Sequence, residues 1–123
     1  MRSVAAEWKD LTMALVGIGS IQPSPLLRES GNAIAPEDQR QLVAAKAVGD
    51  VCQRFFTGTG QLIRSDLDSR VVGIDPETYL AIPRRVGFAG GERKHEAIRA
   101  AIGGGWVNVL VTDVETAKDL LSS

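Results

Sequence analysis

The stretch that decides the fold is RRVGFAGGERKHEAIRAAIGGGWVNVLVTDVETAKDLL, residues 84–121. It begins as a short apolar strand, passes two glycines, and continues over residues 93–102 as a helix with alanine and isoleucine on one face. Three glycines stop that helix, and a second strand (106–112) and a second helix (112–121) follow. This order of strand, helix, strand and helix predicts right-handed parallel crossovers.

The chain upstream of this stretch adds strands to the predicted sheet. TMALVGIG, residues 12–19, is a continuous apolar run, which is typical of a strand covered on both faces in a parallel sheet. Residues 50–64 predict a hairpin in which TGTG makes the turn, and residues 70–74 predict another short strand. We therefore predict that residues 1–123 form a single domain, a three-layer α/β structure with a parallel sheet and an inserted β-hairpin.

Capping and stop signals mark the remaining helices. Residues 36–50 predict a helix that begins with proline and acidic residues and is stopped by Gly49. A short helix over residues 75–82 begins with an aspartate cap and a proline. For the last helix, the spacing of Thr112 and Glu115 predicts a capping box.

The composition excludes several classes of protein. Lys+Arg 14 against Asp+Glu 15 gives a net charge of -1, which argues against attraction of the whole surface to nucleic acid. No apolar run approaches the roughly 20 residues that span a bilayer, and the charged N-terminus does not resemble a signal peptide. A single cysteine, Cys52, excludes an internal disulfide and cannot form a thiolate metal site alone. We expect a cytoplasmic domain with no metal, no cofactor and no membrane contact.

The first glycine loop, VGIGS, follows the apolar strand, at the place where open α/β sheets bind ligands. It carries Gly17 and Gly19. A dinucleotide fingerprint would need a third glycine at Gln22, and no helix follows directly. The two interpretations left open are contact with some other ligand and a strand end that turns tightly.

The second loop, AGGERKH, has more of the features of an anion site. Gly90 and Gly91 let backbone N–H groups approach an anion, and the helix beginning near Glu92 adds its positive end. Lys94 lies in the first helical turn, from which it can reach a phosphate. The loop is not a Walker A motif, and the alternative is an ordinary turn before a charged, solvated helix face.

Four isolated residues have both a functional and a structural interpretation. Asp50 opens a strand, where its carboxylate either accepts hydrogen bonds from sugar hydroxyls or only begins the strand. We expect His95 to be a surface residue, Cys52 to be packed and Trp106 to cap the core.

Taken together, the motifs ALVGIGSI, AVGDVCQRFFTGTGQLI and AIPRRVGFAGGERKHEAIRAAIGGGWVNVLVTDVETAKDLL are similar to a known family. From residue 13 onward the chain resembles the C-terminal half of the sugar-binding domain of SorC/DeoR-type bacterial transcriptional regulators. The resemblance implies a fold like that of the ribose-phosphate isomerase and glucosamine-phosphate deaminase superfamily. It also implies an effector module and not an enzyme: a sugar or sugar phosphate binds, and the oligomer and the DNA affinity of an attached helix-turn-helix change.

The same resemblance assigns an effector site to residues of this chain. It implies that Lys94 contacts the effector phosphate and that Asp50 faces sugar hydroxyls. The expected effector-binding residues are Gly17, Gly19, Asp50, Gly90, Gly91 and Lys94. Arg28 lies where some members place another basic contact, and Gln53 stands where the family usually has glycine.

The chain also departs from the family pattern. Full members carry a helix-turn-helix and a first half of the sugar domain, and neither is recognisable here, so we expect a form shortened by nature or by cloning. DNA would then be reached only through a helix-turn-helix that is not in this chain. We expect an open sheet edge or apolar face that self-association buries. The alternatives are a small sugar-phosphate isomerase or deaminase with Asp50 as its base, and a pure oligomerisation module.

Overall fold

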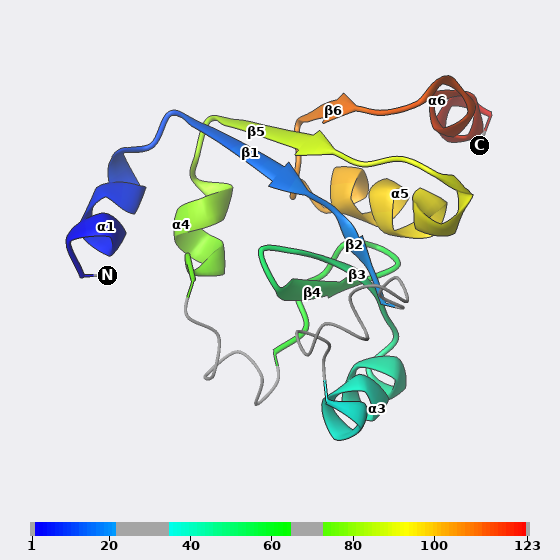
Figure 1. Cartoon of the computed structure of the whole chain (residues 1–123), viewed down its shortest axis with the longest axis horizontal. Coiled ribbons are helices and arrows are strands. Elements are labelled where there is room, and N and C mark those ends of the chain that lie inside the picture. Colours follow the sequence, from blue (N-terminus) through cyan, green and yellow to red (C-terminus); the bar gives the residue numbers. More distant parts are fainter. Residues whose placement is uncertain (1, 22–34, 65–72, 123) are drawn as a thin grey trace.

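The computed structural model describes residues 2–21, 35–64 and 73–122, and in them the chain forms two small sheets (Figure 1). The first sheet is parallel, in the order β1-β5-β6, with strands β1 (Met13–Gly17), β5 (Arg84–Phe88) and β6 (Val109–Val111). The second is antiparallel, in the order β2-β3-β4, with strands β2 (Gly19–Ser20), β3 (Ala47–Val51) and β4 (Arg54–Thr57). The two sheets are joined where β1 runs on into β2.

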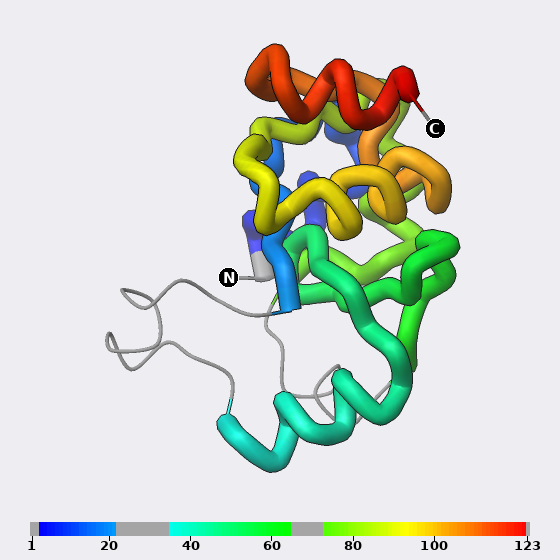
Figure 2. Tube along the Cα trace, turned by 90° about the vertical axis from the view of Figure 1, so that its right-hand side faces the viewer, coloured from blue at the N-terminus to red at the C-terminus, as the bar shows by residue number. Residues whose placement is uncertain are grey.

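Helices surround the sheets, and their bounds are α1 (Arg2–Glu7), α3 (Pro36–Ala44), α4 (Pro76–Leu80), α5 (His95–Gly103) and α6 (Val114–Leu121). Two short 3-10 turns are η1 (Trp8–Asp10) and η3 (Glu92–Lys94). In the side view, α6 lies at the top, α5 below it, the antiparallel sheet lower still and α3 at the bottom (Figure 2). The mixed α/β class, with a parallel sheet and an inserted hairpin, is confirmed.

The core lies between α5, α4 and the two sheets, and aromatic rings organise it. Trp106 is 1% exposed and stacks on Phe56 and Tyr79, with ring centroids 5.5 Å and 6.2 Å away. Its indole N–H donates to the carbonyl of Gly60 at 2.8 Å, and its own carbonyl accepts from the Tyr79 hydroxyl. The expected core role of Trp106 is therefore confirmed, and both polar groups of the buried aromatic pair are satisfied.

The described residues cover only one of the two faces of the parallel sheet. Ala14, Val16 and Leu110 turn toward the core, whereas alternate residues of β1 are exposed, with Leu15 at 64%. The apolar run over residues 12–19 predicted coverage on both faces, and the structure differs from that prediction. It agrees with the other expectation, that an apolar face is left open.

The hairpin turns at a different place from the predicted one. β3 and β4 are joined by Cys52 and Gln53, both in the left-handed region with φ of 52° and 61°, which is the two-residue turn favoured in hairpins. The predicted TGTG turn also exists, with the Gly60 amide donating to the Thr57 carbonyl at 2.8 Å, but the strand after it contributes only the bridge Phe56↔Leu62.

Two helices also begin or end at residues other than the predicted ones. The helix predicted over residues 36–50 ends at Ala44, because β3 begins at Ala47, and Gly49 lies inside that strand. At the last helix the capping residue is Asp113, whose side chain accepts from the Thr116 amide, so the predicted capping box is displaced by one residue. The aspartate cap of α4 is confirmed.

Two sequence predictions fall outside the described part of the chain. Arg28 lies there entirely, as does most of the strand expected over residues 70–74. Among residues 2–21, 35–64 and 73–122, no helix has the length and apolar character that crossing a bilayer requires.

Candidate functional site

The candidate site lies at the edge of the parallel sheet where all three strands end. β1 ends at Gly17, β5 at Phe88 and β6 at Val111, and the strands are parallel, so the three segments that follow them meet at the same edge. Ligands of open α/β sheets bind outside this edge. Both glycine loops of the sequence are found here.

The first loop lies against Asp50. Gly19 in β2 pairs with Asp50 in β3, and a Cβ added at Gly19 would lie 2.2 Å from the carboxylate oxygen Oδ1. Only glycine therefore leaves space for the Asp50 side chain at this crossing. Gly17, in contrast, has no atom within 4 Å of an added Cβ and borders open space.

The Asp50 carboxylate is held by the hairpin turn. Its Oδ2 accepts the Gln53 amide at 3.0 Å, so the residue that sets the turn also orients the carboxylate. Burial raises the pKa of Asp50, while the Gln53 hydrogen bond and the charge of Lys94 oppose that rise. The structure thus brings Gly19, Asp50 and Lys94 together from three separate segments of the chain.

The second loop is fixed from another direction. The Gly91 amide donates to Asp113 Oδ2 at 2.9 Å, and a Cβ added at Gly90 would lie 2.5 Å from that same oxygen. Gly91 has φ of 94°, which favours glycine, and its carbonyl accepts the Lys94 amide at 3.0 Å. The loop therefore binds a carboxylate of its own chain and carries Lys94 on a 3-10 turn ahead of α5.

Asp113 also connects this loop to α5 and α6. Its carboxylate accepts both the amide and the hydroxyl of Thr116 at 2.8 Å, and the Thr116 hydroxyl lies 3.0 Å from His95 Nε2. His95 Nδ1 in turn lies 3.5 Å from Asp119 Oδ2. The hydrogen bonds from the Thr116 amide, the Gly91 amide and the Thr116 hydroxyl lower the pKa of Asp113 to about 2. His95, expected at the surface, is half-buried between the two helices.

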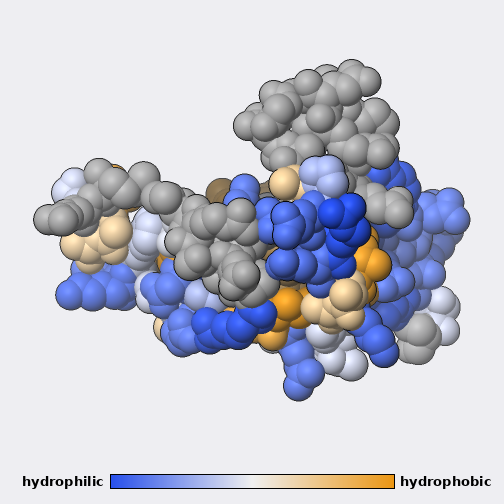
Figure 3. Space-filling model, turned by 90° about the horizontal axis from the view of Figure 1, so that it is seen from below, coloured by the Kyte–Doolittle hydropathy of each residue, from blue (hydrophilic) through white to orange (hydrophobic). Residues whose placement is uncertain are grey.

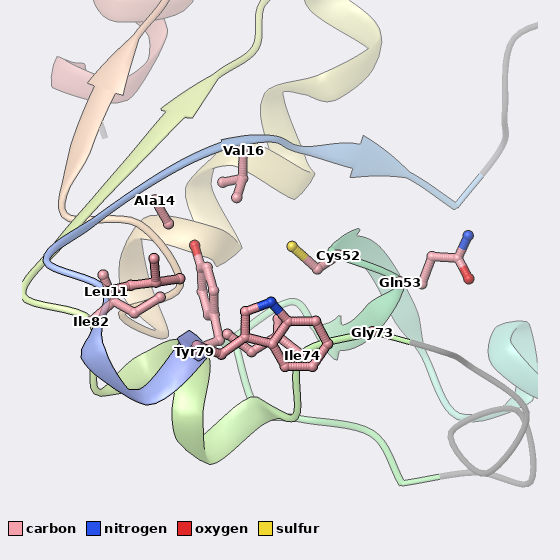
Figure 4. Close-up of a pocket in the computed structure, with 10 residues that line it drawn as sticks. Leu11, Ala14, Val16, Cys52, Gln53, Gly73, Ile74, Tyr79 and Ile82 are labelled. Atoms are coloured by element: carbon pink, nitrogen blue, oxygen red, sulfur yellow. The ribbon is translucent and has the colours of Figure 1, made fainter. Parts of the chain in front are cut away.

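An apolar pocket opens beneath β1, next to the hairpin turn (Figure 4). Its volume is about 390 Å³, and its walls include Trp8, Val16, Tyr79 and Cys52. Cys52 was expected to be packed, but it is an exposed free cysteine at the turn. Partial burial and the Asp50 carboxylate raise the pKa of its thiol, and Arg54 opposes them.

Sequence reasoning missed two of these features. The Cys52–Gln53 turn has none of the glycine or asparagine that usually marks such a turn, although an aspartate three residues before an amide is a common local acceptor. The sequence pattern predicts Thr112 as the cap of the last helix, and the structure places that role on the next residue, Asp113. The spacing of Asp113 and Thr116, a cap followed by its donor, could have identified it.

The geometry suits a polar, anionic ligand. A carboxylate and a lysine next to a glycine strand offer an acceptor for hydroxyl groups and a cation for an acidic group. Within the described ranges, no group of three or more His, Cys, Asp or Glu side chains could hold a metal ion.

Comparison with known proteins places these residues in a family context. Residues 1–122 match a family described as "Putative sugar-binding domain". The chain is 38% identical over 122 residues to the transcriptional regulator LsrR of Escherichia coli and 33% identical over 123 residues to the sorbitol operon regulator of Klebsiella pneumoniae. It also superposes on the full-length sorbitol operon regulator SorC from Klebsiella pneumoniae with a TM-score of 0.86 at 30% identity.

These matches cover nearly all of the chain but a smaller share of each relative. The alignments include 98% of this chain and 38% of LsrR and of the sorbitol operon regulator. For the SorC structure the shares are likewise 98% and 38%. The chain thus spans well under half the length of these relatives.

Proposed function

The chain belongs to the sugar-binding domain family of SorC/DeoR-type transcriptional regulators, and we propose that it binds the sugar or sugar-phosphate effector of such a regulator. The observation that carries the proposal is the meeting of Gly19, Asp50 and Lys94 at the carboxyl edge of the parallel sheet.

Each proposed residue has a role set by its surroundings. Lys94 contacts the effector phosphate, because it lies in the η3 turn and its positive charge acts on the nearby Asp50. Asp50 accepts hydrogen bonds from hydroxyl groups, for which a carboxylate held by the Gln53 amide is preorganised. Gly17 borders open space and leaves room for the ligand, while Gly19 leaves room for the Asp50 carboxylate itself.

Gly90 and Gly91 remain in the proposed site as residues that shape the loop. The Gly91 N–H donates to Asp113, so we assign its contribution to the position of Lys94 and not to direct hydrogen bonding with the effector. This assignment differs from a phosphate-binding glycine loop, in which the amides themselves contact the anion.

We further propose that residues 1–123 act as a regulatory domain and not as an enzyme. The relatives are named as regulators, and that naming agrees with a binding role. In this proposal the domain works in the cytoplasm, associates with itself, and influences DNA only through a helix-turn-helix outside residues 1–123.

Calorimetric titration with phosphorylated trioses, pentoses and hexoses tests the effector site. If a member of this panel binds the wild-type chain, Lys94→Ala should weaken it by about 1.5–3 kcal/mol, which is the contribution of a charge-assisted phosphate contact. Lys9→Ala removes the same charge from η1, away from the site, and should leave the affinity unchanged.

The possible outcomes test the assignment of Lys94 and the retention of effector binding separately. Binding that is equally tight in the wild type and in Lys94→Ala contradicts the assignment of Lys94. Absence of binding to every sugar phosphate and every free sugar of the panel contradicts retained effector binding by this chain.

A further inference from the structure

The turn that carries Lys94 is hydrogen-bonded on both sides to residues at the start of α6. On one side of the turn, the Gly91 amide donates to Asp113 Oδ2 at 2.9 Å. On the other side, His95 Nε2 lies 3.0 Å from the hydroxyl oxygen of Thr116. That hydroxyl donates to the same Asp113 Oδ2 at 2.8 Å, so both flanks of Lys94 are connected to one carboxylate oxygen.

Thr116 is unusual among the described residues because its polar side chain is buried. In the view from below, hydrophilic residues predominate at the surface and apolar ones appear as small patches (Figure 3). Thr116 has an exposed fraction of 0%, and within the described ranges the other buried polar or charged residue is Arg54. A buried hydroxyl is tolerated when it has hydrogen-bond partners, and this one has Asp113 and His95. A valine would fill the same space without any partner, which indicates that the hydroxyl serves these two bonds.

The direction of each hydrogen bond follows from the number of protons available. The Asp113 carboxylate only accepts, because hydrogen bonds lower its pKa to about 2. Thr116 donates its single hydroxyl proton to Asp113, so its oxygen accepts from His95, whose Nε2 must carry a hydrogen. In the neutral imidazole Nδ1 then has no hydrogen, and it lies 3.5 Å from Asp119 Oδ2, which also accepts from Arg99 at 2.7 Å. The Thr116 hydroxyl thus sets both the tautomer and the orientation of the His95 ring.

We propose that Thr116 is a positioning residue for Lys94 and acts through His95. His95 directly follows Lys94 in the chain, so an imidazole held in place fixes the end of the η3 turn. Asp113 fixes the beginning of the turn at Gly91. The consequence for binding rests on the proposed effector site, in which the Lys94 charge must lie beside the ligand.

A fixed turn raises affinity because a mobile lysine is in the binding position for only part of the time. When the binding-competent arrangement is populated only in part, the apparent affinity falls by that fraction. The lysine side chain is a flexible four-carbon stem, so the position of its backbone limits the region that the ammonium group reaches. A loosened turn should therefore weaken binding while the charge itself is still present.

Thr116→Val removes the hydroxyl and keeps the other connection of this residue. The Thr116 amide donates to Asp113 Oδ1 at 2.8 Å from the backbone, so the cap of α6 remains in this variant. Thr116→Ser keeps the hydroxyl and loses only a methyl group, so it should restore what the valine variant loses. Glu115→Gln is the control, because Glu115 is the neighbouring exposed residue of the same helix.

NMR spectroscopy of the ligand-free chain tests the hydrogen-bond arrangement first. The chain has one histidine, so the imidazole nitrogen signals report His95 alone. At pH 8, where a histidine ring is ordinarily neutral, the wild type should show the tautomer with its hydrogen on Nε2. In Thr116→Val the remaining acceptor is Asp119, which faces Nδ1, so the tautomer should change to the one with hydrogen on Nδ1.

Hydrogen exchange then tests whether the turn itself is held. The Lys94 amide donates to the Gly91 carbonyl at 3.0 Å, and its exchange should accelerate about fivefold or more in Thr116→Val. In Thr116→Ser and Glu115→Gln the rate should stay within about twofold of the wild type. Exchange at the Ile63 amide, which is hydrogen-bonded beside the antiparallel sheet, reports global unfolding and should stay unchanged in all variants.

Titration with the sugar-phosphate panel extends the test to binding. If a member of the panel binds the wild type, Thr116→Val should weaken it about three- to tenfold and Thr116→Ser should restore the affinity. If no member binds, the proposed effector site fails, and the Lys94 exchange rate still decides whether Thr116 fixes the turn.

Several results would overturn the positioning role of Thr116. They are an unchanged tautomer or an unchanged Lys94 exchange rate in Thr116→Val, and an affinity that this variant leaves intact. Equal acceleration at Ile63 would show that Thr116 contributes only to global stability. A Thr116→Ser variant that behaves like Thr116→Val would show that the hydroxyl is not the group that matters.

Discussion

The two glycine loops at the carboxyl edge of the parallel sheet have similar sequences and different neighbours. The loop after β1 lies against Asp50, near the charge of Lys94 and next to a surface that is open at Gly17. The loop after β5 is held by Asp113, whose carboxylate accepts a hydrogen bond from the Gly91 amide and leaves no space for a side chain at Gly90. A glycine after a strand is thus evidence of close approach, and at both loops the approaching group is a carboxylate of the same chain, Asp50 at Gly19 and Asp113 at Gly90. The first loop differs in having Gly17 at open space and the charge of Lys94 nearby, which is where we propose that a ligand binds.

The largest effect is expected at the first loop. In Gly19→Ala the new methyl group would lie 2.2 Å from Asp50 Oδ1, so the carboxylate or the strand must move. We expect a loss of about 1–3 kcal/mol in the free energy of unfolding, measured with urea. The matched variant Gly17→Ala meets nothing within 4 Å and should change it by less than about 0.5 kcal/mol. Equal effects of the two variants would contradict the described packing of Gly19 on Asp50.

A smaller effect is expected at the second loop. Asp113→Ala removes the cap of α6 and the acceptor of the Gly91 amide, so Tm should fall by a few degrees and hydrogen exchange at Gly91 should accelerate. Glu115→Gln, in the first turn of the same helix, is the control. An unchanged exchange rate at Gly91 in Asp113→Ala would show that the loop is not held by this carboxylate.

The hydrogen bonds to Asp113 also make the stability of the protein depend on pH in a defined direction. The Thr116 amide, the Gly91 amide and the Thr116 hydroxyl lower the pKa of Asp113 from 3.8 to about 2. A lowered pKa in the folded state stabilises the protein above the unfolded value, and this contribution is lost as the pH falls from about 4 toward 2. Between these pH values, the free energy of unfolding should therefore decrease less for Asp113→Ala than for the wild type.

The smallest effect concerns the thiol beside Asp50. Partial burial and the Asp50 carboxylate raise the pKa of the Cys52 thiol, so alkylation by iodoacetamide at pH 8 should be slower than for a cysteine in a short peptide. Asp50→Asn removes one of the two causes and should speed alkylation a few-fold. The chain has one cysteine, so the rate reports this position alone. A rate that does not respond to Asp50→Asn would place the carboxylate farther from the thiol.

The strands and helices that pack around Trp106 could be predicted from the sequence because local patterns determine them. The apolar strands, the α5 face and the stop at three glycines are short-range signals, and the parallel crossover from β5 to β6 followed from their order. The hairpin turn at Cys52 and Gln53 could not be predicted in the same way. Its left-handed residues are held by the Asp50 carboxylate and by strand pairing, which are not visible in the two turn residues themselves.

The arrangement of the candidate site could be predicted only in part, for the same reason. Glycines after strands and a lysine in a first helical turn indicated where a ligand could bind. The partner of each glycine is set by tertiary contacts: Gly19 meets Asp50 through β2–β3 pairing, and Gly91 meets Asp113 from 22 positions further along the chain. The coverage of the parallel sheet shows the same limit, because the apolar run of β1 fits a strand covered on one face or on two.

The central claim is that an effector binds beside Asp50 and Lys94, and amide chemical shifts followed by NMR during titration with the sugar-phosphate panel test it most directly. The account predicts that the amides of Gly19, Gln53 and Lys94 shift in a saturable manner, while the Gly91 amide, bound to Asp113, moves least among the loop residues. Large shifts at Gly91 together with unchanged Gly19 and Gln53 amides would contradict it and place the ligand on the second loop.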